Sequence, residues 1–210
     1  MDLFPYVVQQ GDHLLALAAR YGFDADLVWQ DKANEALRKQ GRDPNILLPC
    51  DVLYLPEPKK KWLPIKVGAA NAFVAKVPGI PVQFALAQNG KPLAGEACIV
   101  HLAPDQSVTA DGSGVLSFKV PATMRQVAVS IPRLALVRTF KIGHLDPVSE
   151  DSGIRQRLKN LGFGPKDPAG LTDGVIFTRA LARFQTAQGL PPSGQVDDAT
   201  RAALAKAHGC

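Results

Sequence analysis

The middle of the chain, residues 67 to about 143, consists of short apolar runs separated by turn signals, with no long stretch of helical periodicity. The signals are Asn-Gly, Ala-Gly, Pro-Asp and Asp-Gly-Ser-Gly. Such spacing is typical of antiparallel strands joined by tight turns. We therefore predict one small β-sandwich. The apolar runs are residues 73–77, 82–86, 97–102, 115–120, 127–129 and 134–137.

This central segment also resembles a known kind of bacterial module. The phrases GKPLAGEACIVHL and SVTADGSGVLSFKVP are similar to immunoglobulin-like or prealbumin-like modules, in which a Thr-x-x-Asp-Gly turn connects two strands. A calcium loop is the alternative for the Asp-Gly turn, but it would need further carboxylates at alternating positions after Asp111. We expect a structural turn there, because Asp-Gly-x-Gly favours one by its own backbone chemistry.

The N-terminal segment predicts a strand, two helices and a second strand. A β-branched and aromatic run at residues 6–9 opens the segment, and apolar residues then recur at helical spacing up to Tyr21. Gly11 permits the turn before this helix, Asp12 is expected to cap it, and Gly22 is expected to end it.

A second helix is expected to begin at the capping residue Asp24 and to run towards Leu37. Residues 44–49 then return the chain to a closing strand at residues 51–55. The order βααβ predicts a small α+β unit.

These N-terminal residues resemble the LysM domain. YVVQQGDHLLALAARYGF and NILLPCDVLYLP are similar to the family's strand, Gly-Asp-Thr-Leu turn, helices and closing Pro-Gly-x-x-Leu-x-Ile-Pro strand, with His13 in place of Thr and Cys50 in place of Gly. The resemblance implies binding of N-acetylglucosamine-containing glycans in a groove between two loops. Carried over by position, the glycan-binding residues are Gly11, Asp12, His13 and Leu14 on one side and Ile46, Leu47, Leu48, Pro49 and Cys50 on the other.

The C-terminal segment shows three amphipathic helical patterns. The first places Ile154, Leu158 and Leu161 on one face and is expected to end at a glycine. The second begins at Arg179, and the third begins at the capping residue Asp197. We predict a three-helix bundle with one shared core.

This segment resembles the three-helix peptidoglycan-binding domains. The family's middle loop reads Asp-Gly-x-x-Gly-x-x-Thr, and residues 169–178 lack that spacing. Most of the matching residues are expected to hold the fold and not to touch a ligand. The matches are Leu158, Leu161, Gly162 and Phe163, then Phe184, Gln185, Gly189 and Leu190, then Gly194, Val196, Asp197, Thr200 and Leu204.

The predicted fold class is thus multidomain α+β. We assign residues 1–56 to a LysM-like domain, 57–66 to a linker, 67–145 to the β-sandwich and 146–210 to the helical domain. The linker assignment follows from its prolines and from Lys59, Lys60 and Lys61, which contribute little to a packed core.

The net charge of +5 and the pI near 9.2 suit anionic partners such as teichoic acids, phospholipid surfaces or acidic proteins. Acidic residues are interspersed and no basic stripe emerges, so nucleic acid is not an expected partner. No run approaches the roughly 20 apolar residues that cross a bilayer, so no membrane insertion is expected.

No catalytic constellation emerges. His13, His101, His144 and His208 are scattered without metal-ligand spacing, and there is no Gly-x-Ser-x-Gly elbow or phosphate-binding glycine loop. The ending His-Gly-Cys210 resembles part of the Ser-His-Gly-Cys motif of L,D-transpeptidases, but a frayed terminus is the favoured interpretation. We expect no enzyme, no metal and no cofactor.

The odd cysteine count and the absence of a disulfide spacing favour an intracellular origin. Cys50 and Cys98 are expected to be buried and Cys210 to be exposed. The start MDLFPYVVQQGDH has no signal-peptide pattern, so we expect synthesis in the cytoplasm.

The module order resembles that of proteobacterial proteins encoded beside type VI secretion spike and effector components. The phrases that carry this resemblance are DPNILLPCDVLYLP, FKIGHLDPVSEDSGIRQRLKNLGF and SGQVDDATRAALAKAHGC. It implies that a secretion apparatus delivers the protein to the periplasm or to a target cell.

Two functions remain open. The first is a non-catalytic, secretion-associated protein that binds peptidoglycan. The second is an adaptor or accessory component of the secretion spike or its effector, in which glycan-binding folds are reused to hold protein partners.

Overall fold

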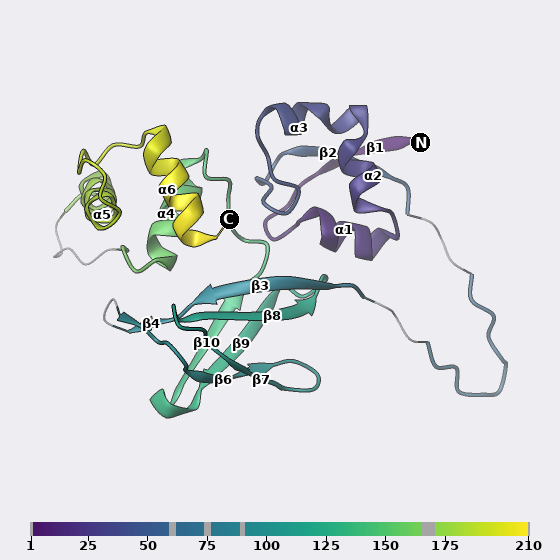
Figure 1. Ribbon diagram of the computed structural model, residues 1–210. Coiled ribbons are helices and arrows are strands. Elements are labelled where there is room, and N and C mark those ends of the chain that lie inside the picture. Colours follow the sequence, from purple (N-terminus) through teal and green to yellow (C-terminus); the bar gives the residue numbers. More distant parts are fainter. Residues whose placement is uncertain (1, 59–61, 74–76, 89–90, 165–170, 210) are drawn as a thin grey trace. The chain divides into compact units, whose positions relative to one another are not determined.

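The computed structural model describes residues 2–58, 62–73, 77–88, 91–164 and 171–209, and it combines helices with antiparallel sheets (Figure 1). Contacts divide the chain into two units. The first comprises Met1–Pro81, Lys119–Gln126 and Lys141–His144, and the second comprises Val82–Phe118, Val127–Phe140 and Leu145–Cys210. Several predictions concern residues outside the described part, namely Lys59 to Lys61, residues 74–76, the Asn89-Gly90 turn, residues 169–170 and Cys210.

In the first unit, a pair of antiparallel strands lies next to short helices (Figure 1). Strand β1 (Leu3–Val7) pairs with β2 (Val52–Pro56), so that Tyr6 lies opposite Leu53. The helices are α1 (Leu14–Tyr21), α2 (Ala25–Gln30) and α3 (Glu35–Lys39), with the 3-10 turn η1 (Lys32–Asn34) before α3. This arrangement agrees with the predicted order of strand, helices and strand.

The expected helix from Asp24 to Leu37 is interrupted. Asp24 caps α2 as predicted, with its carboxylate accepting a hydrogen bond from the Leu27 N–H at 3.0 Å. Asp31 then adopts extended backbone angles, and its Oδ1 accepts from the Ala33 N–H at 2.9 Å. Because this bond caps a new turn, α2 ends and a separate helical turn, η1, begins after Asp31.

Apolar side chains from α1, α2, α3 and β2, together with Val8 and Leu47 from the connecting segments, share one core. Asn34 is the polar residue at its edge, only 1% exposed, and its side chain connects the helices to β2. Its Nδ2 donates to the carbonyls of Val28 and Tyr54, each at 2.9 Å, and its Oδ1 accepts from the Tyr54 N–H at 2.8 Å. The buried apolar residues are Val8, Leu14, Leu17, Val28, Trp29, Leu37, Leu47, Leu53 and Leu55.

The central segment forms antiparallel strands, as its turn spacing predicts. One sheet has the order β10-β9-β6-β7, with β6 (Ala97–His101) antiparallel to both β7 (Gln106–Thr109) and β9 (Gln126–Ile131). The other strands are β3 (Gly79–Ala85) beside β8 (Val115–Pro121), β4 (Ala87–Gln88) beside β5 (Lys91–Pro92), and β10 (Leu136–Lys141) in the larger sheet.

Burial alternates along β6, β8 and β9, so each of these strands has one inner face. Leu116, Phe118 and Val120 of β8 are buried, and exposed residues separate them. Phe84 of β3 stacks on Phe140 of β10, with the ring centroids 4.1 Å apart.

The apolar runs at 82–86, 97–102, 115–120 and 127–129 thus lie largely in strands, and the run at 134–137 leads from the 3-10 turn η2 (Pro132–Leu134) into β10. The expected strand at 73–77 is not found at its two described ends, Phe73 and Val77. The sandwich and its likeness to immunoglobulin-like or prealbumin-like modules stay predictions.

Asp111 makes the structural turn that its sequence favours. Its Oδ1 accepts hydrogen bonds from the Val115 N–H at 2.9 Å, the Ser113 N–H at 2.9 Å and the Ser113 hydroxyl at 2.8 Å. These bonds, with that from Val115 the strongest, lower the pKa of the Asp111 carboxyl.

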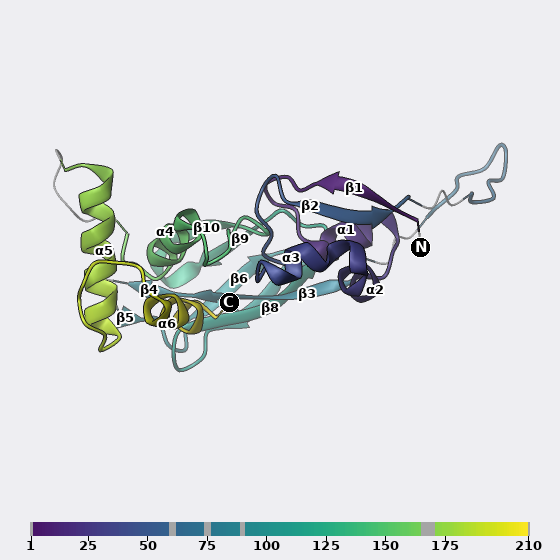
Figure 2. The same ribbon diagram turned by 90° about the horizontal axis from the view of Figure 1, so that it is seen from above.

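Three helices form the C-terminal region: α4 (Asp151–Asn160), α5 (Asp173–Ala187) and α6 (Asp198–His208) (Figure 2). Asp197 caps α6 as predicted, accepting from the Thr200 N–H at 2.7 Å. Helix α5 begins at Asp173, well before the expected start at Arg179. The buried core is Ile154, Leu158, Ala180, Leu181, Phe184 and Leu204.

We predict that Asn34→Ala destabilises the first unit by about 2–4 kcal/mol, because it removes three hydrogen bonds and leaves both backbone groups of Tyr54 without their side-chain partner. Denaturant unfolding followed by Trp29 fluorescence measures the change. Gln30→Ala, at an exposed site on α2, is the control. Equal unfolding midpoints for the two variants would contradict this role of Asn34.

Candidate glycan-binding sites

The first predicted wall of the LysM-like groove, Gly11 to Leu14, is buried. Asp12 and His13 are each only 3% exposed. Asp12 does not cap α1 as expected. Its Oδ2 instead accepts from the Tyr6 hydroxyl at 2.6 Å and from the Gln9 N–H at 3.0 Å, which closes the turn after β1. Burial, followed by the hydrogen bond to Asp12, raises the pKa of the Tyr6 hydroxyl.

His13 is the residue that caps α1. Its Nδ1 accepts from the Ala16 N–H at 3.3 Å, which satisfies one of the free N–H groups at the start of the helix. Burial lowers the pKa of His13 and outweighs the opposing effects of Asn45, Asp12 and the Ala122 backbone. The neutral ring therefore belongs to the folded state near neutral pH.

Two later segments of the same unit, Lys119–Gln126 and Lys141–His144, lie against this wall. Gln10 Nε2 donates to the His144 carbonyl at 3.4 Å, and Arg125 Nη2 lies 3.7 Å from Asp12 Oδ1. Gly143 has φ +72°, and a Cβ there would lie 2.7 Å from the Gly11 carbonyl oxygen. Since backbone approaches backbone at this point, only glycine fits at position 143.

The second predicted wall, Ile46 to Cys50, keeps more exposure. Leu47 is buried in the core, Ile46, Leu48 and Pro49 are half-buried, and Cys50 is exposed. The expectation that Cys50 is buried was therefore wrong, whereas Cys98 is buried as expected. The two walls are neighbours, because the Leu14 N–H donates to the Pro44 carbonyl at 2.9 Å.

Cys50 adopts φ +75°, a left-handed conformation that favours glycine. Its N–H donates to the Val8 carbonyl at 2.9 Å, and this bond fixes the turn into β2. Glycine at this position in the LysM pattern suits the same backbone geometry.

In the C-terminal region, most residues that match the peptidoglycan-binding pattern are buried or half-buried, and Gly162, Gly189 and Asp197 are exposed. Gln185 is 1% exposed, and its amide donates to the Thr200 hydroxyl at 3.0 Å and to the Gln195 carbonyl at 2.9 Å. Its Oε1 accepts from the Gly194 N–H at 2.9 Å. As predicted, these residues hold the loop before α6 in place.

A second candidate group lies on α4 and α5, where Arg155 and Phe177 are half-buried and Phe177 packs partly against the helical core. The Arg155 guanidinium lies 4.0 Å from the centre of the Phe177 ring, and its Nη1 lies 3.0 Å from Asp173 Oδ2. Our prediction missed this group, here called the Arg155–Phe177 cluster. The sequence placed the start of α5 after Phe177, so the helical spacing from Asp173 to Phe177 was not used.

The histidines have separate surroundings. His101 contacts Asp105 at 3.2 Å and Ser130 at 2.6 Å, and His208 contacts Asn160 at 3.0 Å. Burial and then the positive charge of Arg157 lower the pKa of His208. Within the part of the chain that the structure describes, no group of three or more His, Cys, Asp or Glu residues could hold a metal ion.

Comparison with known proteins adds one finding. Residues 152–204 match the family model described as "Putative peptidoglycan binding domain". This match confirms the peptidoglycan-binding type predicted for the C-terminal segment. No curated protein and no solved structure matches the chain. In the described residues, no helix has both the length and the apolar character that crossing a membrane requires.

We predict that the stability of the first unit falls as the pH decreases from about 7 to about 5. His13 has a lowered pKa in the folded state, so the unfolded chain takes up its proton first, and acid therefore favours unfolding. Protonation also removes the acceptor for the Ala16 N–H. His13→Asn keeps a capping acceptor without this titration and should flatten the pH dependence of the unfolding midpoint.

His101→Asn is the matched control at an exposed site, and His208 is retained in both variants. An unchanged pH dependence in His13→Asn would show that His13 does not govern this effect.

Proposed function

We propose that this protein binds peptidoglycan without cleaving it, and that the C-terminal helices make the contact. The observation that carries the proposal is the family match over residues 152–204, together with the Arg155–Phe177 cluster inside the matched range. His101 lies between the Ser130 hydroxyl and the Asp105 carboxylate, and the proposal assigns this exposed contact no catalytic role.

The chemistry of the cluster suits both components of peptidoglycan. A sugar ring can stack its apolar C–H face on Phe177, and the carboxylates of the stem peptides can pair with the guanidinium of Arg155. Asp173 now holds Arg155 at 3.0 Å in an exposed ion pair. Such pairs contribute little stability, so a ligand carboxylate can replace Asp173 at small cost.

We predict that Arg155→Ala and Phe177→Ala each weaken co-sedimentation with purified sacculi by about tenfold or more, equivalent to about 1.4 kcal/mol of binding free energy. Arg138→Ala, which removes an exposed arginine from β10, should sediment like the unchanged protein. Equal sedimentation of all variants, with unfolding midpoints unchanged, would remove the cluster from the proposal.

A second candidate function is the protein-binding adaptor of a type VI secretion spike or effector. Its specific support is the burial of Gly11 to Leu14, because the polar groups of that wall already bond within the chain. A LysM-like unit with one wall covered is better suited to protein contacts. Delivery to the periplasm or to a target cell belongs to this proposal and rests on the resemblance of the whole module order.

Titration with N-acetylglucosamine oligomers separates the two uses of the first unit. The adaptor function predicts no saturable heat of binding and no perturbation of residues 46–50 in amide spectra. Saturable binding that Leu48→Ala weakens, with Leu27→Ala on α2 as the exposed control, would contradict the adaptor function and support the predicted groove.

A further inference from the structure

The positive charge of this protein is concentrated in one stretch. Between residues 58 and 95 the sequence contains six lysines and no Asp, Glu, Arg or His. Without these six, the chain has eighteen basic and nineteen acidic residues, so the stretch accounts for the whole positive net charge. A region with cations and no acidic residue attracts anionic surfaces.

The same stretch exposes large apolar side chains. Trp62 is 91% exposed and Val67 is 96% exposed, and Leu63, Ile65 and Phe73 are each more than half exposed. Elsewhere, Phe4, Val7 and Val52 are exposed on the paired strands β1 and β2, whereas Leu27 and Val137 are isolated in sequence. Apolar residues grouped in this way mark a surface that another phase or molecule covers.

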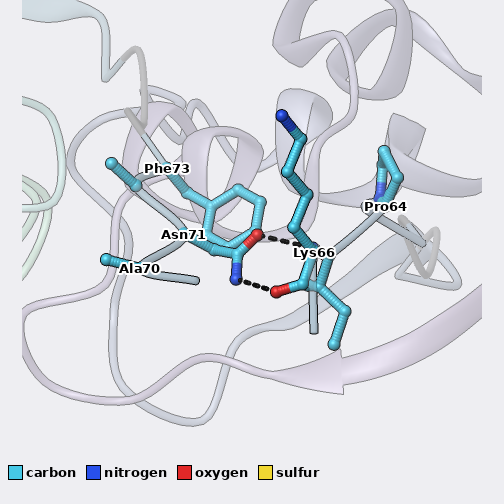
Figure 3. A pocket seen from close by; sticks show the side chains of 7 residues that line it. Pro64, Lys66, Ala70, Asn71 and Phe73 are labelled. Carbon is cyan, nitrogen blue, oxygen red and sulfur yellow. Dashed lines mark hydrogen bonds between the residues drawn. The ribbon is translucent and has the colours of Figure 1, made fainter. Parts of the chain in front are cut away.

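A local hydrogen-bond clamp gives this segment a defined shape. Asn71 Oδ1 accepts from the Lys66 N–H at 2.8 Å, and Asn71 Nδ2 donates to the Lys66 carbonyl at 3.0 Å (Figure 3). Asn71 Nδ2 also donates to the Ala69 carbonyl at 2.9 Å. The closed loop surrounds a hollow of about 350 Å³, to which Pro64, Ile65 and Phe73 contribute. The apolar side chains therefore project from a closed loop.

We propose that residues 62–73 dock onto the surface of an anionic phospholipid membrane. Trp62 would lie at the level of the headgroups, where amphipathic rings are favoured, with the neighbouring aliphatic side chains at the edge of the acyl region. Lys66, within the docking segment, would pair with the lipid phosphates. This is adsorption to one leaflet, since the segment is too short to cross a bilayer.

The uninterrupted positive charge of this stretch favours a lipid surface over a protein or a nucleic acid as its partner. A protein groove would bury the apolar residues but would not require 38 residues without a carboxylate. A nucleic acid would use the lysines and leave the aliphatic side chains in water. The proposal is independent of peptidoglycan binding and would place the protein where membrane and cell wall meet.

Flotation with vesicles tests the proposal on the full chain. We expect binding to vesicles of phosphatidylcholine with phosphatidylglycerol, weak binding to phosphatidylcholine alone, and loss of binding at high salt. Trp62 emission should shift to the blue on binding, while buried Trp29 contributes a constant background. The double variant Trp62→Ser, Val67→Ser should lose at least tenfold in binding.

Leu27→Ser, Val137→Ser is the matched control and should bind like the unchanged protein, because it removes two exposed apolar residues from other surfaces. Unfolding midpoints verify that both double variants are folded. Absence of binding by the unchanged protein would overturn the proposal and leave the apolar segment to a protein partner. Equal binding by the two double variants, or equal binding to neutral and anionic vesicles, would also overturn it.

Discussion

The first unit depends on the hydrogen-bonded turn that Asp12 and His13 make after β1. The Asp12 carboxylate accepts hydrogen bonds from Tyr6 and Gln9 and so closes the turn. The His13 side chain caps the start of α1. These bonds leave the turn with few exposed polar groups, so segments from much later in the sequence can lie over it. The covering segments in turn exclude water and keep His13 neutral. The residues that a groove would present to a sugar are thus used to build the unit.

The C-terminal helices follow the same principle. Gln185 and Thr200 match the peptidoglycan-binding pattern, and both bond to the protein's own loop and helix. A family pattern of this kind mainly records what the fold needs. The proposed binding cluster accordingly uses side chains outside the pattern, since Arg155 and Phe177 are half-buried, remain partly accessible and lie in contact with each other.

Local signals in the sequence predicted local structure well. The caps at Asp24 and Asp197, the stop at Gly22 and the strands β6, β8 and β9 are all where short-range chemistry places them. Strand β7 was missed because its residues, Gln106 to Thr109, are mostly polar and its partner β6 supplies the reason for pairing. The burial of Gly11 to Leu14 could not be predicted in the same way, since the residues that cover this loop lie beyond position 118. Asp12 and His13 are adjacent, and either could cap α1. Asp12 bonds to the Tyr6 hydroxyl, which leaves His13 as the cap, and this contact is not evident from the sequence.

The contact between Gly11 and Gly143 also restricts how this sequence can change. Both residues have positive φ, and each would bring a Cβ within 3.0 Å of an atom on the other segment. A Cβ at position 143 would meet the Gly11 backbone and separate the turn from the segment that covers it, whereas a Cβ at position 11 would meet the His144 side chain. The close approach of two distant segments therefore rests on the missing side chain at position 143, and a chain with another residue there would need a different covering segment.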